Sequence, residues 1–508
     1  MLPRRDMPAP VVSEPTTIHS RIKQAYVWTI AGSAVRYGVT FGLSLLLARL
    51  LTAEDYGLLG MMLVFTEFLV GIFDAGLSQA VVHFTEDDAE ALPTYFTTSL
   101  LLGTTFTLVL FGAAPFIAAL YHEPRLTLLL RVMSFTLLLG SIRCISAGIL
   151  SRELRFRTLS YVEIGSAIAS GLVSVGMALL GFGVWSLIAG SCLLTAIQTV
   201  AYAWYARPKF RFPLDRKVLL RIFRYSTPLV GSSLLFKFYE NSDYLVVGKL
   251  LGPAALGFYA LAFRLTMLMN DRVSAVINRV AFPSFANLKH QPEEVVAHWF
   301  TASKRVTLIT FPVLAALAIA GEDFIRVVLR PQWLPALVPL RFLCVMAGVK
   351  ILTNIIGQIL AATGHPSLLF RFELISAISL PVSFFIGCKL GGILGVGIAW
   401  CTVFPLIRLA YLLAARSVLR FKLSDYLANL CQPAALTLTC AVAILPLHWL
   451  LPSGALRLCL SSLSWLVAGG CYCALNPELR KLLASGLAAA RASASSRSRR
   501  ADRGSIAI

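Results

Sequence analysis

The sequence predicts an all-α polytopic membrane protein, built from two related six-helix lobes and two further C-terminal helices. Composition supports the membrane class, because 57% of the 508 residues are hydrophobic and only 14% are charged, whereas soluble domains carry about 25% charged residues. Apolar runs of about 20 residues, long enough to cross a bilayer, recur along most of the chain. An internal repeat at a spacing of about 200 residues indicates the two lobes.

The repeat is visible in two short segments. The matching pairs are Ala48-Arg49-Leu50-Leu51 with Gly57 against Gly248-Lys249-Leu250-Leu251 with Gly257, and Glu163–Ile168 against Glu373–Ile378. Membrane proteins made of two related halves are typically transporters whose substrate binds between the halves. The repeat therefore favours a transporter.

About fourteen apolar runs qualify as membrane-spanning helices. They lie near 26–51, 57–82, 95–120, 126–150, 159–181, 184–206, 222–250, 256–283, 300–321, 334–360, 368–390, 392–415, 427–451 and 456–476. This layout predicts the following parts: a cytoplasmic N-terminal segment 1–24, a first lobe 25–206, a linker 207–221, a second lobe 222–415, a terminal helix pair 423–476 and a basic tail 477–508.

The basic residues predict the orientation. Lys and Arg concentrate in 152–157, 207–221, 416–422 and the tail, and such loops mark the cytoplasmic side. Both termini are therefore expected in the cytoplasm, and the two lobes are expected to be related by an axis along the membrane normal. The acidic segment 86–90 is the one exception among the predicted cytoplasmic loops. Topology explains most of the net charge of +20, so no nucleic-acid partner is expected.

Several ionisable residues interrupt the apolar runs of corresponding helices in the two lobes. They are Arg36, Glu67 and Asp74 in the first lobe, and Lys237, Glu240, Asp243, Arg264, Asp271, Arg272 and Arg279 in the second. A charge at the bilayer centre costs a few kcal/mol even on insertion scales, so such residues face a cavity or a partner. The set therefore predicts a polar cavity lined by the first two helices of each lobe.

Two roles are predicted for these side chains. The candidates for binding an anionic or glycan substrate are Arg36, Lys237, Asn241, Arg264 and Arg272, because cationic groups form charge-assisted hydrogen bonds with phosphate. The candidates for binding a coupling H⁺ or Na⁺ are Glu67, Asp74, Glu240 and Asp271.

The alternative interpretation is that these charges are ion pairs that join helices, such as Lys237 with Glu240 or Asp271 with Arg272. Secondary candidates, for a portal or for local pairing, are Arg131, Arg143, Lys350 and Gln358. Glu163 and Glu373, which lie near basic residues at predicted cytoplasmic helix ends, are expected to form structural salt bridges.

No catalytic constellation stands out in the sequence. It has no phosphate-binding glycine loop and no Cys or His spacing typical of a metal site, so neither a cofactor nor a metal is expected. The longest predicted external loop, 321–333, is too short for the catalytic loop of a membrane glycan polymerase or ligase. An enzyme is therefore not expected.

The segment Leu47–Met61, which reads LARLLTAEDYGLLGM, closely resembles the signature of Wzx-type oligosaccharide flippases of the multidrug/oligosaccharidyl-lipid/polysaccharide exporter superfamily. Phe73–Ala80, Asp243–Gly252 with Leu256–Tyr259, and Leu360–Gly364 also look typical of these transporters. The resemblance covers about residues 20–420.

The resemblance implies a V-shaped pair of lobes in the bacterial cytoplasmic (inner) membrane. It also implies translocation of undecaprenyl-diphosphate-linked oligosaccharides by alternating access, coupled to H⁺ or Na⁺, for O-antigen, capsule or exopolysaccharide export. The implied partners are the lipid-linked oligosaccharide, membrane lipids, and a glycan polymerase or other assembly proteins. An organic-cation antiporter of the same superfamily is the main alternative, and a glycan polymerase or ligase is a weaker one.

Overall fold

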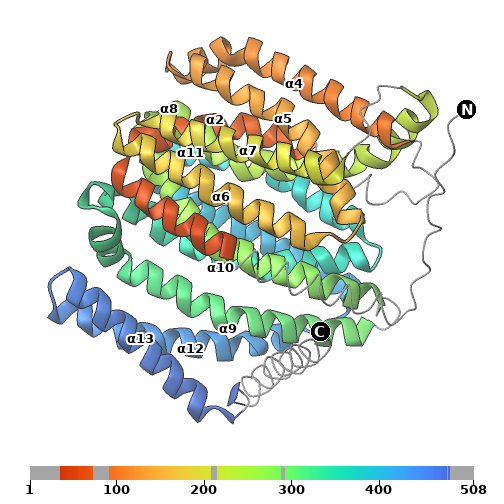
Figure 1. Ribbon diagram of the computed structural model, residues 1–508. Helices are drawn as coiled ribbons and strands as arrows, with labels where there is room; N and C mark the ends of the chain where they lie inside the picture. The colour runs from red at the N-terminus through yellow and green to blue at the C-terminus, as the bar shows by residue number, and fades with distance from the viewer. Residues whose placement is uncertain are drawn as a thin grey trace, which may run out of the picture. The chain divides into compact units, whose positions relative to one another are not determined.

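The computed structural model describes residues 32, 35–72, 91–207, 214–287, 292–477 and 479–480; the side chains of 225, 228, 229, 232, 268–287, 292, 358, 361, 362 and 366 lie outside this description. Every regular element in the described part of the chain is a helix (Figure 1). The all-α polytopic fold class that the composition predicts is confirmed. Backbone hydrogen bonds within each helix satisfy the peptide groups, which is required in the hydrocarbon layer.

The described helices follow the predicted apolar runs closely. Residues 35–50 are helical and precede the labelled elements. The latter are α2 (Ala53–Ile72), α4 (Leu92–Tyr121), α5 (Leu126–Arg152), α6 (Phe156–Leu179), α7 (Val184–Ala206), α8 (Arg216–Asn287), α9 (Pro292–Phe324), the π-helix η3 (Ile325–Leu329), the 3₁₀-helix η4 (Pro331–Ala336), α10 (Leu337–Ala362), α11 (Pro366–Leu419), α12 (Leu423–Leu450) and α13 (Ala455–Leu475).

Two of the long helices are interrupted at glycine. Within α8 the backbone leaves the helical region at Gly252, with φ 83°, and within α11 it does so at Gly391 and Gly392, with φ 58° at the latter. A positive φ is accessible to glycine without the steric cost that a side chain imposes. These breaks coincide with the predicted boundaries between neighbouring runs. Eleven helices of the described chain are long and apolar enough to span a membrane, and the count of fourteen remains a prediction.

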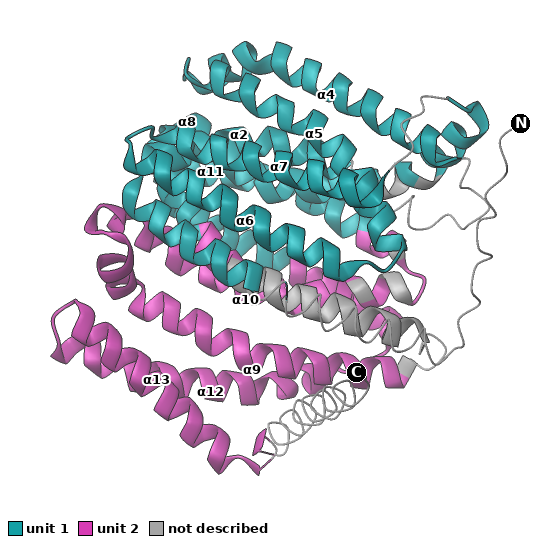
Figure 2. Cartoon of the chain, viewed as in Figure 1, with its two compact units in different colours: residues 1–262, 370–407 teal, residues 263–369, 408–508 magenta. Residues whose placement is uncertain are grey.

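Contacts divide the chain into two compact units (Figure 2). The first contains residues 1–262 and 370–407, and the second contains residues 263–369 and 408–508. The first predicted lobe falls wholly within the first unit, whereas residues of the second predicted lobe are distributed over both. The division into six-helix lobes remains a prediction.

In the first unit, α5 packs against both α4 and α7, and α6 packs against α7. Small hydroxyl side chains join these helices. Ser99 on α4 donates a hydrogen bond to the Ser141 carbonyl oxygen at 2.8 Å, and Thr199 on α7 donates to the Leu139 carbonyl oxygen at 3.0 Å. Small and hydroxyl residues are typical of helix contacts in membranes, because they allow close approach and supply interhelical hydrogen bonds.

A reciprocal backbone contact joins the two copies of the repeat within the first unit. A Cβ atom on Gly57 would lie 1.7 Å from the carbonyl oxygen of Pro253, and one on Gly257 would lie 1.7 Å from the carbonyl oxygen of Ala53. Equivalent residues therefore exchange equivalent contacts, which is the property of a two-fold relation. Only glycine permits backbones to approach this closely. The repeat that the sequence predicts is thus present in the packing of α2 against α8.

In the second unit, α9 packs against α10 and α12, and α12 packs against α13. The Trp299 ring stacks on Tyr426 with 4.9 Å between ring centroids, and Asn429 donates a hydrogen bond to the Phe300 carbonyl oxygen at 2.8 Å. Trp465 on α13 donates to the Pro312 carbonyl oxygen at 3.2 Å. These contacts fasten the terminal helix pair, α12 and α13, to α9.

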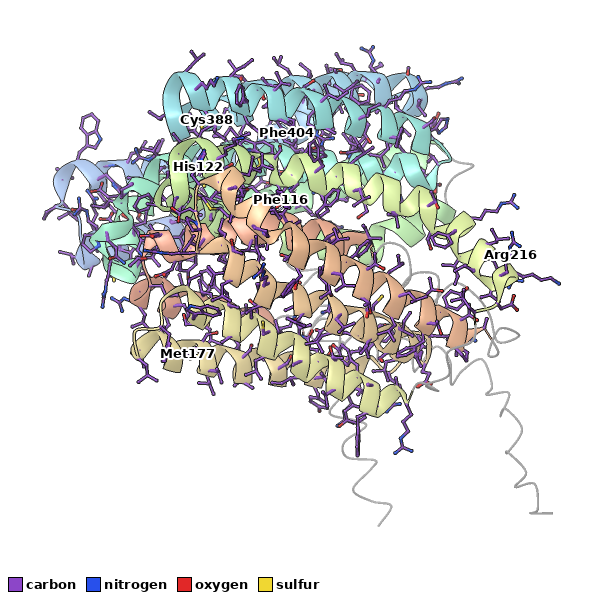
Figure 3. All side chains as sticks on the ribbon, turned by 90° about the horizontal axis from the view of Figure 1, so that it is seen from above. Phe116, His122, Met177, Arg216, Cys388 and Phe404 are labelled. Carbon is purple, nitrogen blue, oxygen red and sulfur yellow. The ribbon has the colours of Figure 1, made fainter. Side chains whose placement is uncertain are left out.

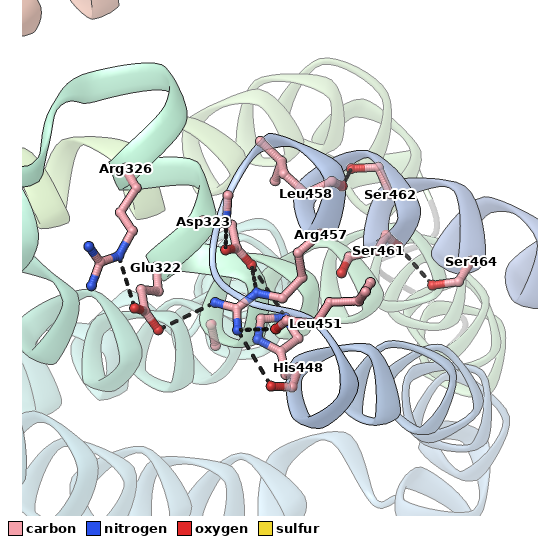
Figure 4. Close-up of polar contacts among 12 residues, drawn as sticks. Glu322, Asp323, Arg326, His448, Leu451, Arg457, Leu458, Ser461, Ser462 and Ser464 are labelled. Atoms are coloured by element: carbon pink, nitrogen blue, oxygen red, sulfur yellow. Dashed lines mark hydrogen bonds and ion pairs between the residues drawn. The ribbon is translucent and has the colours of Figure 1, made fainter.

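A buried ion pair fixes the turn between α12 and α13 (Figure 4). Asp323, 0% exposed at the end of α9, accepts a hydrogen bond from Arg457 Nε at 2.6 Å and another from the Gly454 backbone N–H at 3.0 Å. Arg457 also approaches Glu322 at 3.5 Å. Because Asp323 has a cationic partner and further hydrogen bonds, the free-energy cost of removing its charge from water is offset.

Apolar side chains also cover much of the outer surface (Figure 3). Phe116 on α4 is 77% exposed, whereas Phe404 on α11 is buried, and both are labelled in the figure. In a membrane protein such exposed apolar surface is solvated by lipid tails, so it carries no penalty. Together with the eleven candidate spans of the described chain, this apolar surface indicates a multi-pass membrane protein.

Candidate functional site

Lys237 and Glu67 form an ion pair inside the first unit. The Nζ atom of Lys237 on α8 lies 3.1 Å from Oε2 of Glu67 on α2 and donates a hydrogen bond to it. The Lys237 side chain is 29% exposed and that of Glu67 is 45% exposed. The pair is therefore reachable by a ligand, although both residues lie in helices that qualify as membrane spans.

The local sequence explains how α2 positions Glu67. The helix begins with a reciprocal cap: the Thr52 backbone N–H donates to Asp55 Oδ2 at 3.0 Å, and the Asp55 N–H donates to Thr52 Oγ1 at 3.3 Å. Such a box satisfies the free donors of a helix start. Gly71 lies one turn after Glu67, and a Cβ there would be 3.6 Å from Lys237 Cγ. The aliphatic stem of Lys237 thus crosses α2 beside Glu67.

The other predicted cavity residues of the second lobe have different surroundings. Asn241 on α8 donates its side-chain N–H to the Lys237 carbonyl oxygen at 2.9 Å, so it supports the helix that carries Lys237. Glu240 is half-buried in the first unit, and Arg264 is exposed in the second. Asp74 and the side chains of Asp271 and Arg272 lie outside the described residues.

Arg36 belongs to a second ionic cluster in the first unit. Its Nε atom lies 3.5 Å from Oε2 of Glu163 on α6, and its guanidinium lies 4.4 Å from the centre of the Tyr37 ring. Arg143 on α5 donates to the Gln198 side-chain oxygen at 3.0 Å. Gln198 in turn donates a hydrogen bond to Ser166 Oγ on α6 at 3.1 Å, three residues after Glu163. The salt bridge predicted for Glu163 is present, with Arg36 as its partner.

This cluster has more positive than negative charge. Arg36 and Arg143 contribute two guanidinium groups, whereas Glu163 contributes one carboxylate. The Nε atom of Arg143 is buried and has no hydrogen-bond partner within the part of the chain that the structure describes, whereas that of Arg36 is the atom that faces Glu163. Guanidinium groups suit oxyanions such as phosphate, which accept several hydrogen bonds at once. The cluster therefore favours an anionic ligand.

Asp243 is a buried polar centre that is not among the site residues predicted from the sequence. It is 0% exposed and accepts hydrogen bonds from the Tyr259 hydroxyl at 2.5 Å, from Trp400 Nε1 at 3.2 Å and from the Tyr244 backbone N–H at 2.7 Å. The single Trp400 N–H is shared, because it also donates to the Tyr259 hydroxyl at 2.8 Å. Both oxygens of the Asp243 side chain are hydrogen-bonded, as burial of a polar group requires. Its position in an apolar run was a signal, but its partners on α8 and α11 could not be anticipated.

Eleven candidate spans, a repeat with two-fold contacts and ionic side chains within the spans define a multi-pass membrane protein of transporter type. The model of the family described as polysaccharide biosynthesis protein matches residues 46–338. The chain belongs to this family, and the resemblance seen in its sequence motifs is confirmed.

Several named proteins are similar to this chain. The teichuronic acid biosynthesis protein TuaB of Bacillus subtilis is 26% identical over 402 residues, which cover 75% of this chain and 82% of that protein. The succinoglycan biosynthesis transport protein ExoT of Rhizobium meliloti is 27% identical, with coverage of 72% and 74%. The lipopolysaccharide biosynthesis protein WzxC of Escherichia coli is 24% identical, with coverage of 81% and 85%.

Solved structures share the fold at low sequence identity. The lipid II flippase MurJ in an inward closed conformation superposes with a TM-score of 0.71 at 15% identity and covers 90% of this chain and 100% of that one. An inward-facing multidrug transporter of the MATE family superposes with a TM-score of 0.62 at 16% identity and covers 76% and 94%. These likenesses establish the fold.

Proposed function

We propose that this protein is a flippase that moves an undecaprenyl-diphosphate-linked oligosaccharide from the cytoplasmic to the outer leaflet of the bacterial cytoplasmic membrane. Family membership supports a role in polysaccharide biosynthesis. The names of TuaB, ExoT and WzxC associate those relatives with teichuronic acid, succinoglycan and lipopolysaccharide. The glycan carried by this chain belongs to the same broad class of cell-surface polysaccharide.

The Lys237–Glu67 pair carries the proposal. The pair is partly exposed and lies within helices that qualify as membrane spans. A diphosphate that binds there takes the place of the Glu67 carboxylate as the partner of the Lys237 ammonium group. Lys237 keeps an anionic partner when a phosphate oxygen replaces Glu67, so the exchange does not leave the lysine charge uncompensated. A phosphate group carries a higher charge density than a carboxylate and accepts more hydrogen bonds, and the exchange is therefore favourable.

The exchange also links substrate binding to a carboxylate. When the diphosphate binds Lys237, Glu67 loses its cationic partner, and its carboxylate then attracts a coupling cation in place of Lys237. Glu67 thus joins Asp74, Glu240 and Asp271 as a candidate for ion coupling. The cluster of Arg36 and Arg143, with its excess of positive charge, is a second position for the diphosphate.

The same charges argue against an organic-cation antiporter, because a cationic drug is attracted to carboxylates and repelled by two guanidinium groups. The proposed orientation has both termini in the cytoplasm, as the basic loops predict. The substrate is then delivered from the cytoplasmic side and released to a glycan polymerase or another assembly protein on the outer side.

Deletion of the gene tests the function in cells. We expect diphosphate-linked oligosaccharide to accumulate in the cytoplasmic leaflet of the deletion strain, and the wild-type gene on a plasmid to clear it. The measurement is extraction of lipid-linked glycan followed by mass spectrometry. A strain that accumulates no such lipid but becomes sensitive to cationic drugs would contradict the proposal and favour the antiporter.

A further inference from the structure

A small cavity lies in the first unit, away from the ionic pairs described above. It has a volume of about 270 Å³ and is formed where α2, α5 and α7 begin. Its polar wall contains Thr52, Glu54, Asp55 and Arg125, and its apolar wall includes Leu128 and Trp185. These helix starts are on the side of the membrane that we predict to be external.

The residues of the polar wall contact one another and the neighbouring backbone. Asp55 Oδ2 accepts hydrogen bonds from the Thr52 N–H at 3.0 Å and from its hydroxyl at 2.8 Å. Oδ1 of the same carboxylate lies close to Gly183, where a Cβ would be 2.9 Å away. Glu54 Oε1 accepts from Arg125 Nη1 at 2.8 Å. The cavity therefore presents two carboxylates as hydrogen-bond acceptors and the guanidinium of Arg125 as a donor of several hydrogen bonds.

Trp185 supplies a surface of a different kind. It is the second residue of α7 and is half-buried in the apolar wall of the cavity. An indole ring provides a large, rigid apolar face together with one polar N–H group. A sugar ring has matching features, since its C–H face is apolar and its edge carries hydroxyl groups that both donate and accept hydrogen bonds.

We propose that this cavity binds a single sugar residue, with the C–H face on Trp185 and the hydroxyls on Glu54, Asp55 and Arg125. The volume lies just below the range of about 300–1,000 Å³ found for drug-sized ligands, so one ring fits and an oligosaccharide extends outward. The site adds to the proposed function a contact with the glycan, separate from the ionic groups proposed for the diphosphate.

Saturation-transfer NMR on the full chain in lipid nanodiscs tests this site. The probes are methyl glucoside, methyl galactoside, methyl mannoside and methyl glucuronoside, with glycerol phosphate as a lipid-headgroup probe. Trp185→Ala removes the stacking face, and Leu128→Trp fills the cavity from its exposed edge. Trp204→Ala is the matched control, because Trp204 is 72% exposed near the other end of α7.

The expected result is saturation transfer from the wild type to at least one methyl glycoside. The signal should fall about fivefold in Trp185→Ala and in Leu128→Trp and remain unchanged in Trp204→Ala. The proposal is overturned if no glycoside receives transfer, if only glycerol phosphate does, or if both cavity variants match the wild type. Because binding is measured without transport, its outcome is separate from that of the proposed function.

Discussion

Replacing both Lys237 and Glu67 by methionine is expected to leave a folded protein that transports at least about tenfold more slowly than the wild type. Hydrogen bonds to charged groups contribute about 1.5–3 kcal/mol, which corresponds to roughly tenfold or more in rate or affinity. Two methionines fill a similar volume and leave no uncompensated charge, so helix packing is retained. The measurement is clearance of lipid-linked glycan in the deletion strain, with the protein level measured in parallel.

A single variant of the pair and a control variant at a distant lysine complete this test. Lys237→Met alone leaves Glu67 without its cation, and we expect loss of both stability and transport. Lys249→Met removes an exposed lysine from the same helix and should leave transport unchanged. If the double methionine variant transports as fast as the wild type, the pair serves helix packing only and does not bind substrate.

Substituting alanine for Gly57 is expected to lower the free energy of unfolding by about 1–3 kcal/mol, the usual cost of overpacking. In an open helix, alanine in place of glycine instead stabilises by up to about 1 kcal/mol. The new methyl group would lie 1.7 Å from the Pro253 carbonyl oxygen. Backbone atoms cannot rotate away from it, so α2 and α8 must separate. The measurement is thermal unfolding in detergent.

Gly112→Ala is the matched control, because Gly112 is also within a helix and a Cβ atom added there would have no neighbouring atom within 4 Å. It should unfold at the same or a higher temperature. Gly257→Ala should reproduce the effect of Gly57→Ala, since the two contacts are reciprocal. Equal unfolding temperatures for the wild type and both contact variants would contradict the close backbone contact.

The fold was largely predictable because a bilayer imposes a simple rule on length and polarity. Run lengths located the helices, and the breaks at Gly252 and Gly392 fell where the apolar runs were divided. The repeat around Gly57 and Gly257 predicted that the two residues are equivalent. It did not predict that their backbones touch, because a sequence repeat shows which residues are equivalent but not how far apart they lie in space.

The sequence indicated individual charged residues of the site, but it did not indicate which residues they contact. Lys237 and Arg36 stood out because charges are rare in apolar runs. Their partners Glu67 and Glu163 lie on other helices; the former is 170 positions away in sequence. Helical periodicity assigns a residue to a face, but the neighbour across that face depends on how helices rotate and pack. Nothing in the sequence around Trp400 indicated that its indole N–H would hydrogen-bond to Asp243.

Reconstitution is the most direct test of the claim that the protein flips a lipid-linked oligosaccharide. Purified protein is placed in vesicles containing undecaprenyl-diphosphate oligosaccharide, and the fraction of glycan cleaved by an impermeant external glycosidase is followed over time. With wild-type protein, cleavage should proceed beyond the outer-leaflet fraction, and with the double Lys237 and Glu67 variant it should do so at least about tenfold more slowly. If wild-type vesicles stop at the same fraction as protein-free vesicles, under conditions of ion gradient and potential, the protein is not a flippase for this lipid.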